Sequence, residues 1–267
     1  MNLITIDFET YYSKEYGLKK YTTEAYIRDP QFEVIGVAVK ENNKDTVWFS
    51  GSHEEIKSFL HSYDFENSFA LGHNMRFDGA ILSWIFDIKP KGLLDTMGMG
   101  TLLHGLTESV SLNNLSGLYG LGVKGTEVQD ALGKHRNQFS VNELHNYGLY
   151  CKNDVNLTHA LFYQLIPKYN KTELKLIDLT IRMFTEPAIQ LNKGLLVRHL
   201  ADVKATKEEL LDKVAVCKDS LMSNPKFAEI LESLKIKVPM KTSPATGKQT
   251  YAFAKTDEGF KALLSHD

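Results

Sequence analysis

Several features that mark common protein classes are scarce or missing in this sequence of 267 residues. It has only two cysteines, Cys151 and Cys217, and their wide separation fits neither a disulfide framework nor a zinc motif. No apolar run is long enough to cross a bilayer, and the N-terminus lacks a basic segment followed by an apolar one. We therefore expect a soluble cytoplasmic protein without a membrane partner.

An excess of basic residues is also missing. The chain has 31 Lys and Arg against 33 Asp and Glu, a net charge of −2. The overall basic charge that is typical of nucleic-acid-binding proteins is therefore absent. Because an acidic metal site would mask local basic grooves in this total, nucleic-acid binding stays open. With 43% hydrophobic residues, the chain can form one sizeable core and part of another.

The most informative stretch is a short apolar strand near the N-terminus, which ends at Asp7 and Glu9. Side chains alternate along a strand, so both carboxylates leave one face and Phe8 leaves the other. Two neighbouring carboxylates repel, and burying either alone is costly. A hard divalent cation between them would offset this cost, because such ions prefer oxygen ligands. The alternative is a strand end that passes into a solvated turn.

The rest of the N-terminal part alternates strand and helix patterns. Beyond the first strand, we expect strands over residues 32–40, 46–50 and 68–71 and helices over 52–60, 77–86, 111–118, 141–167, 174–184, 194–220 and 227–234. Turn residues between the first two of these strands predict a hairpin, and Ser52 with Glu55 predicts a capping box. Strands followed by helices indicate a layered α/β domain.

A glycine-rich segment over residues 117–125 literally contains the pattern of a dinucleotide-binding loop, at Gly120, Gly122 and Gly125. That loop must follow a strand and begin a helix. Here it follows a helical pattern, so we interpret the segment as a flexible turn.

Two further acidic residues stand where sites are commonly built. Asp78 follows a predicted strand, at the beginning of a helix. Asp154 lies four residues after Tyr150, on a helix face that also carries Tyr147 and Cys151. A buried aspartate needs a partner or a metal. The alternatives are a first-turn helix charge for Asp78, and a salt bridge or a hydrogen bond to Tyr150 for Asp154.

Three short patterns together resemble the motifs of the DEDD superfamily of 3′–5′ exonucleases: Asp7-x-Glu9, Asn74-x-x-x-Asp78 and Tyr150-x-x-x-Asp154. The position five residues before the last aspartate is Leu149 rather than histidine, so the resemblance is to the DEDDy type. It implies a ribonuclease-H-like fold over residues 1–187, with a mixed β-sheet flanked by helices. A mostly helical extension over 188–267 would follow.

The resemblance also implies residue roles and a cofactor. Two divalent ions, Mg²⁺ or Mn²⁺, would be held by the four carboxylates of the motifs: Asp7, Glu9, Asp78 and Asp154. Tyr150 would orient the attacking water, since a phenol with a pKa near 10 is not ionised at neutral pH. Thr10 and Asn74 would orient the 3′-terminal nucleotide.

The C-terminal part carries a second resemblance. Its segments over 227–231, 239–243, 247–248 and 251–257 resemble the beginning of the polymerase portion of bacteriophage-type family A DNA polymerases. This implies a proofreading exodeoxyribonuclease that acts on single-stranded DNA or frayed DNA 3′ ends, in the host cytoplasm if the gene belongs to a phage. Polymerase activity is not expected from this chain alone, and a separate polymerase part or an accessory protein would be its partner. The alternatives are a ribonuclease D-like exoribonuclease and a non-catalytic subunit that docks a polymerase.

Overall fold

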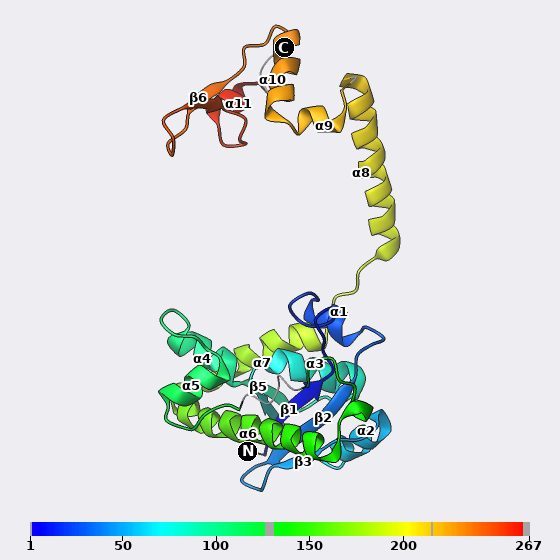
Figure 1. Ribbon diagram of the computed structural model, residues 1–267, viewed down its shortest axis with the longest axis vertical. Coiled ribbons are helices and arrows are strands. Elements are labelled where there is room, and N and C mark those ends of the chain that lie inside the picture. The colour runs from blue at the N-terminus through cyan, green and yellow to red at the C-terminus, as the bar shows by residue number, and fades with distance from the viewer. Residues whose placement is uncertain (1, 126–130, 215, 264–267) are drawn as a thin grey trace. The chain divides into compact units, whose positions relative to one another are not determined.

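The computed structural model describes residues 2–125, 131–214 and 216–263 (Figure 1). It divides into two units, Met1–Ile189 and Gln190–Asp267. The sequence prediction placed the division after residue 187. The two units are described separately below.

Unit 1 is built on a five-stranded mixed sheet with the order β3-β2-β1-β4-β5. The central strand β1 (Leu3–Thr10) pairs antiparallel with β2 (Val34–Glu41) and parallel with β4 (Phe69–Gly72). Strand β3 (Val47–Phe49) extends the sheet antiparallel to β2, and β5 (Gly92–Asp95) extends it parallel to β4. The predicted hairpin of β2 and β3 is thereby confirmed.

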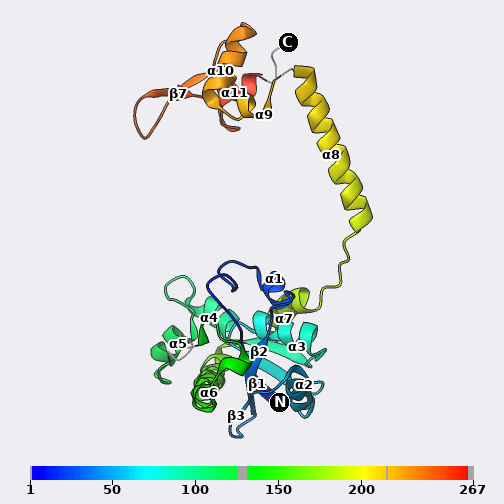
Figure 2. The same ribbon diagram turned by 45° about the vertical axis from the view of Figure 1, so that its right-hand side comes forward.

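Helices cover both faces of this sheet. In chain order they are α1 (Thr23–Ile27), α2 (His53–His61), α3 (Met75–Ile85), α4 (Thr96–His104), α5 (Leu112–Leu118), the 3₁₀ helix η2 (Arg136–Gln138), α6 (Val141–Leu165), the 3₁₀ helix η3 (Ile166–Lys168) and α7 (Lys171–Thr185). Side chains of α2, α3 and α7 pack in the core of one face, and those of α4, α5 and α6 pack in the core of the other. Figure 2 shows α2 and α6 on opposite sides of the strands. The predicted class, a mixed sheet flanked by helices, is confirmed.

The alternation of β1 separates its apolar side chains from its polar ones. Ile4, Ile6 and Phe8 lie in the core with α2 and α3. On the other face, Thr5 Oγ1 is hydrogen-bonded to His159 Nδ1 of α6 at 2.9 Å. Because Asp7 and Glu9 continue the face of Thr5, both carboxylates point toward α6.

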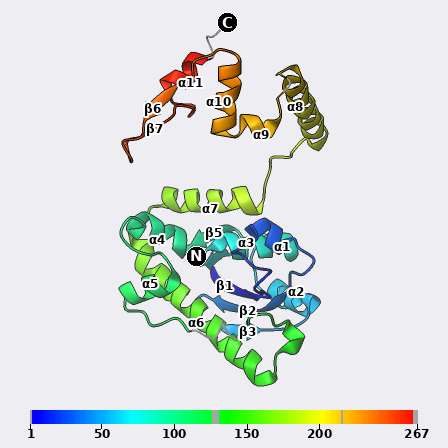
Figure 3. The same ribbon diagram turned by 45° about the horizontal axis from the view of Figure 1, so that its top comes forward.

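A close approach of α6 to the sheet fixes which of its residues meet β1. The indole of Trp48 lies between β2 and α6, where a Cβ at Gly36 or at Gly148 would be 2.4 Å from its ring. Any larger side chain at either glycine would therefore push the helix away. The turn of α6 that contains Gly148 also brings Tyr147 and Cys151 against the carboxyl end of β1. Figure 3 shows α6 running along the sheet.

Unit 2 contains one long helix, α8 (Lys193–Val214), and several short elements: α9 (Lys218–Leu221), α10 (Asn224–Ser233), the hairpin strands β6 (Met240–Thr242) and β7 (Gln249–Tyr251), and α11 (Glu258–Ala262). The single helix predicted over 194–220 is wrong, because the extended backbone of Cys217 (φ −74°, ψ 151°) separates α8 from α9. Within the described part of the chain, no helix combines the length and apolar character needed to cross a bilayer.

Candidate active site

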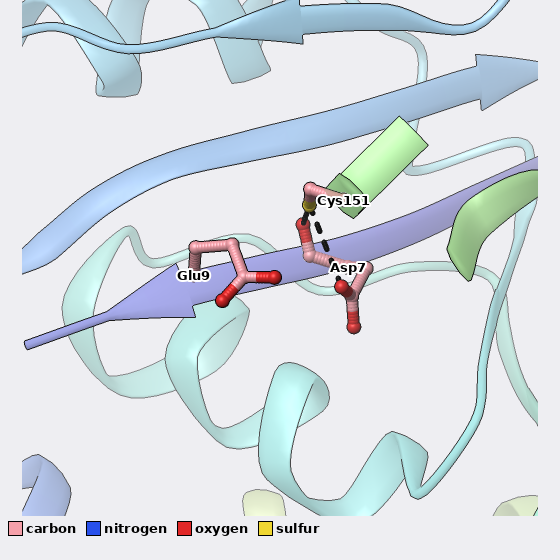
Figure 4. A group of neighbouring side chains, drawn as sticks. All are labelled: Asp7, Glu9 and Cys151. Atoms are coloured by element: carbon pink, nitrogen blue, oxygen red, sulfur yellow. Dashed lines mark hydrogen bonds between the residues drawn. The ribbon is translucent and has the colours of Figure 1, made fainter. Parts of the chain in front are cut away.

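A compact group of ligand atoms lies where β1 ends against α6. Asp7, Glu9 and Cys151 each offer one atom, and these atoms lie within 4.8 Å of one another (Figure 4). Carboxylate oxygens at this spacing suit a hard divalent cation. Sequence reasoning predicted the two carboxylates at this place but not the cysteine.

Cys151 acts here as a hydrogen-bond donor. Its Sγ lies 3.4 Å from both the carbonyl oxygen and Oδ2 of Asp7. Burial, and then the charge of Asp7, raises the pKa of this thiol well above its ordinary value, so it keeps its proton. The donor set for a metal is therefore made of oxygens. The only signal in the sequence was the position of Cys151 on the buried face between Tyr147 and Asp154.

Asp78 reaches the same region from the first turn of α3. Its Oδ1 accepts a hydrogen bond from the backbone N–H of Phe8 at 3.1 Å, and the residue is 2% exposed. Burial, and then the charge of Asp7, raises the pKa of Asp78 well above its ordinary value. Asp78 thus belongs to the same electrostatic cluster, although it is not part of the compact ligand group.

Asn74 is held at the beginning of α3 by a residue that sequence reasoning missed. Its backbone is left-handed (φ 74°), a conformation that asparagine tolerates better than most residues. Its N–H donates to Asp95 Oδ1 at 2.8 Å, and Asp95 also caps α4 through Met97 N–H at 3.0 Å. The side chain of Asn74 makes no capping hydrogen bond.

Asp154 is buried on α6 and is paired with Lys124. The Nζ of Lys124 lies 2.5 Å from Asp154 Oδ2, and the Asp154 side chain is 5% exposed. Of the alternatives predicted for Asp154, the structure contains a salt bridge, which is formed with Lys124. Lys124 lies in the glycine-rich segment that we interpreted only as a turn, so no sequence pattern pointed to it.

Two tyrosines of α6 take different positions. The hydroxyl of Tyr147 donates to Glu9 Oε2 at 2.5 Å. Tyr150 stacks against Tyr147, and Lys124 Nζ lies 5.2 Å from the centroid of the Tyr150 ring. Burial, and then the charge of Asp154, raises the pKa of Tyr150, so its hydroxyl stays protonated. Sequence reasoning missed Tyr147 as a partner of a site carboxylate.

Burial and mutual repulsion make this cluster unfavourable without a cation. Burial, followed by the charge of Asp154, raises the pKa of Asp7 to about 7. Burial, followed by the charge of Asp7, raises the pKa of Glu9 well above its ordinary value. Raised carboxyl pKa values are expected where acidic groups share a site that a cation would neutralise. The residues therefore fit one or more divalent metal ions.

A cleft of about 620 Å³ adjoins Glu9. Its lining residues are Phe8, Glu9, Thr10, Tyr12, Ser13, Lys14, Gly17, Leu18, Lys19, Lys20, Tyr26, Phe77, Leu132 and Tyr147. Thr10, expected to contact a nucleotide, lines it and is hydrogen-bonded through Oγ1 to the Tyr26 hydroxyl at 2.8 Å. The other expected contact, Asn74, is not among the described residues that line it. Apolar walls beside lysines and an acidic end suit a terminal nucleotide.

Comparison with known proteins gives one matching family and several solved structures of similar fold. Residues 17–170, more than half of the chain, match the family described as 3′–5′ exonuclease. The match includes Asp78, Tyr150 and Asp154 and begins after Asp7 and Glu9. No curated protein matches the sequence.

Among solved structures, RNase D of Trypanosoma brucei is 16% identical with a TM-score of 0.53, over 71% of this chain and 68% of that one. The same enzyme in complex with RNA U12 is 15% identical with a TM-score of 0.52, over 71% and 66%. Brucella melitensis NrnC is 16% identical with a TM-score of 0.48, over 68% and 81%. At these identities, the likeness to RNase D establishes the fold.

Proposed function

The chain belongs to the 3′–5′ exonuclease family, and from this premise we propose that it removes nucleotides from DNA 3′ ends, as the proofreading part of a family A DNA polymerase. The observation that carries the proposal is the electrostatic cluster around Asp7. The charge of Asp7 raises the pKa of both Glu9 and Asp78, and Asp154 raises that of Asp7. Four carboxylates from β1, α3 and α6 are therefore coupled near the carboxyl end of the central strand β1.

We assign these carboxylates to the binding of two divalent ions, Mg²⁺ or Mn²⁺. The proposed ligands are Asp7, Glu9, Asp78 and Asp154. Such ions stabilise negative charge on the attacking and leaving oxygens of a phosphodiester and lower the pKa of a bound water. The carboxylates must be ionised to bind cations, so Asp7, with a pKa of about 7, loses its proton as metal binds.

The two tyrosines orient groups around the carboxylates in this proposal. Tyr147 fixes Glu9 through its hydroxyl, which donates to Oε2 at 2.5 Å. Tyr150, of the DEDDy type, keeps its proton because its pKa is raised. It can therefore hold the attacking water by a hydrogen bond but cannot act as a general base.

The proposed substrate is the 3′-terminal nucleotide of single-stranded DNA or a frayed end, bound in the cleft beside Glu9. Lys14, Lys19 and Lys20 line this cleft and are suited to phosphate contacts. The choice of DNA over RNA is supported by the resemblance of segments over 227–257 to family A polymerases. We propose that a polymerase part, or an accessory protein, is the partner that delivers the primer end.

The test is incubation of the purified protein with 5′-labelled single-stranded DNA and with RNA of matched sequence, in Mg²⁺, in Mn²⁺ and in EDTA. We expect a ladder that shortens from the 3′ end of DNA and disappears in EDTA. Faster shortening of RNA would replace the proposal with an exoribonuclease. Intact oligonucleotides in every lane, with DNA still bound, would indicate a non-catalytic docking subunit.

A further inference from the structure

Lys124 is a basic residue that lies beside the carboxylate cluster and interacts with it electrostatically. It forms the 2.5 Å ion pair with Asp154, and its charge lowers the pKa values of Asp7 and Glu9, against the effect of burial and neighbouring carboxylates. A lysine at this place has two possible effects on metal binding. It supports binding if it orients the Asp154 carboxylate, and it opposes binding if its ammonium group takes the position of the metal ion at that carboxylate. The two possibilities predict opposite effects of its removal.

The residues that directly precede Lys124 are held against α6. Asn153 Nδ2 donates to the carbonyl of Val123 at 3.1 Å, and Leu121 N–H donates to the carbonyl of Ser116 at 2.9 Å. At Gly122 (φ 133°), a Cβ would lie 3.3 Å from Leu157 Cδ2 of α6. The backbone therefore presents Lys124 to the cluster, although the segment has no regular secondary structure.

We propose that Lys124 is a built-in counter-cation, which neutralises Asp154 in the metal-free protein and is displaced from it when a divalent ion binds. This inference rests on the proposed function, because it takes Asp154 as a metal ligand. In this proposal Lys124 is a positioning residue: its ion pair holds the Asp154 carboxyl group in place before metal binds, at a cost in metal affinity.

The physical reason is charge. Asp154 lies in a cluster with three other carboxylates, and without a partner its buried charge would be strongly unfavourable. An ammonium group is a compact cation on a flexible stem, so it can occupy the place and leave it again. A divalent ion at the same carboxylate would be repelled by the ammonium charge a few ångströms away. Displacement of Lys124 removes most of this repulsion.

The first test is a calorimetric titration with Mg²⁺ alone, carried out on the whole protein as wild type and as Lys124→Met. Methionine keeps an unbranched side chain that is one atom shorter, and it removes the charge. We expect Lys124→Met to bind Mg²⁺ about tenfold more tightly, because the variant has no ion pair at Asp154 that must be broken before the metal binds. Lys124→Arg keeps the charge and should stay near the wild-type affinity.

A matched control is available in the same unit. Lys134 forms a 2.5 Å ion pair with Glu143 and is as exposed as Lys124, with side-chain exposures of 33% and 32%. It does not pair with a carboxylate of the cluster. Lys134→Met should therefore leave the Mg²⁺ affinity unchanged.

The opposite result is equally well defined. Removal of a residue that only orients a metal ligand typically lowers the metal affinity of the protein by roughly 10–100-fold. Weaker or unchanged binding by a folded Lys124→Met protein would therefore overturn the proposal. If the wild type itself bound neither Mg²⁺ nor Mn²⁺, the proposed function would fail as well, so the two failures can be told apart.

A second measurement needs no variant. The wild-type protein is treated with an amine-acetylating reagent in EDTA and in Mg²⁺, and modification at each lysine is followed by mass spectrometry. We expect Lys124 to react several-fold faster in Mg²⁺, because its ammonium group has left Asp154, whereas Lys134 reacts equally in both. Equal reactivity of Lys124 in the two conditions would overturn the displacement.

Discussion

The two units of this protein differ in whether they bury acidic side chains. Unit 1 buries Glu9, Asp78, Asp95 and Asp154, each no more than 8% exposed. The buried residues described in unit 2 are Ala228, Leu231 and Ala252, and its pair of Lys241 and Asp257 remains partly exposed. A carboxylate can be buried only where the surrounding structure supplies donors and countercharges. The packed layers of unit 1 supply them, whereas the described elements of unit 2 bury few side chains, so the buried carboxylates described here all lie in unit 1.

The largest expected effect on the exonuclease rate comes from substitutions that remove a carboxylate of the cluster in unit 1. Asp7→Ala or Asp154→Ala should lower the 3′–5′ exonuclease rate by roughly 10²–10³-fold or more, because stabilisation of transition-state charge is lost. The fold should persist, since these residues serve the metal site rather than the core, and circular dichroism checks this. Asp257→Ala removes a carboxylate from unit 2 instead and should leave the rate unchanged. Full activity in a folded Asp7→Ala protein would end the proposed mechanism.

The next effect separates the two tyrosines of unit 1. Tyr147→Phe removes the donor to Glu9, so metal affinity should fall by about tenfold, at the lower end for outer partners of metal ligands. Tyr150→Phe should slow hydrolysis by about tenfold, the loss of one hydrogen bond to a charged or reacting group, and should keep metal affinity. Metal titration and single-turnover rates, measured on both variants, distinguish the roles. A loss of metal affinity in Tyr150→Phe would refute the role assigned to it.

A moderate effect follows from the raised pKa of Asp7. Its pKa is about 7 in the folded protein and about 3.9 in an unfolded chain, so the folded state binds more protons between these values. The metal-free protein should therefore lose stability as the pH rises from about 4 to 7. Glu9 and Asp78 act in the same direction, because their pKa values are also raised.

The measurement is thermal unfolding in EDTA and in Mg²⁺ from pH 5.5 to 8.5. The melting temperature in EDTA should fall with rising pH, and the increase caused by Mg²⁺ should grow, because metal binding requires ionised carboxylates. Asp7→Asn should flatten the dependence in EDTA. A metal-free protein that becomes more stable over this pH range would contradict the assignment of Asp7.

The smallest effect on catalysis should come from unit 2. Leu231 is 5% exposed, so Leu231→Ala should destabilise unit 2 by about 2–5 kcal/mol. The hydrolysis of a short single-stranded DNA should remain within twofold of the wild type, since unit 1 contains the whole carboxylate cluster. Proteolysis confined to residues after 189, together with the rate, checks this. A hydrolysis rate that fell together with the stability of unit 2 would contradict the conclusion that unit 1 alone contains the groups needed for catalysis.

The local pattern of the chain was enough to predict the framework of unit 1. The predicted capping box of Ser52 and Glu55 begins α2 in the structure, and the predicted β2–β3 hairpin is present. The helix predicted over 194–220 failed because a break at Cys217 carries no strong local signal. Helical periodicity reports the side of an element that is apolar, not the residue at which the helix must end.

Local sequence is enough to predict that Asp7 and Glu9 leave one face of a strand and that Tyr150 and Asp154 share one face of a helix, because the periods of strand and helix follow from backbone geometry. The contacts of Tyr147 with Glu9, of Cys151 with Asp7 and of Lys124 with Asp154 arise from the packing of separate elements. These pairs join different elements, and their partners depend on how closely and in which register α6 packs on the sheet. That packing is set by the Trp48 indole against two glycines, a steric contact that no local pattern encodes.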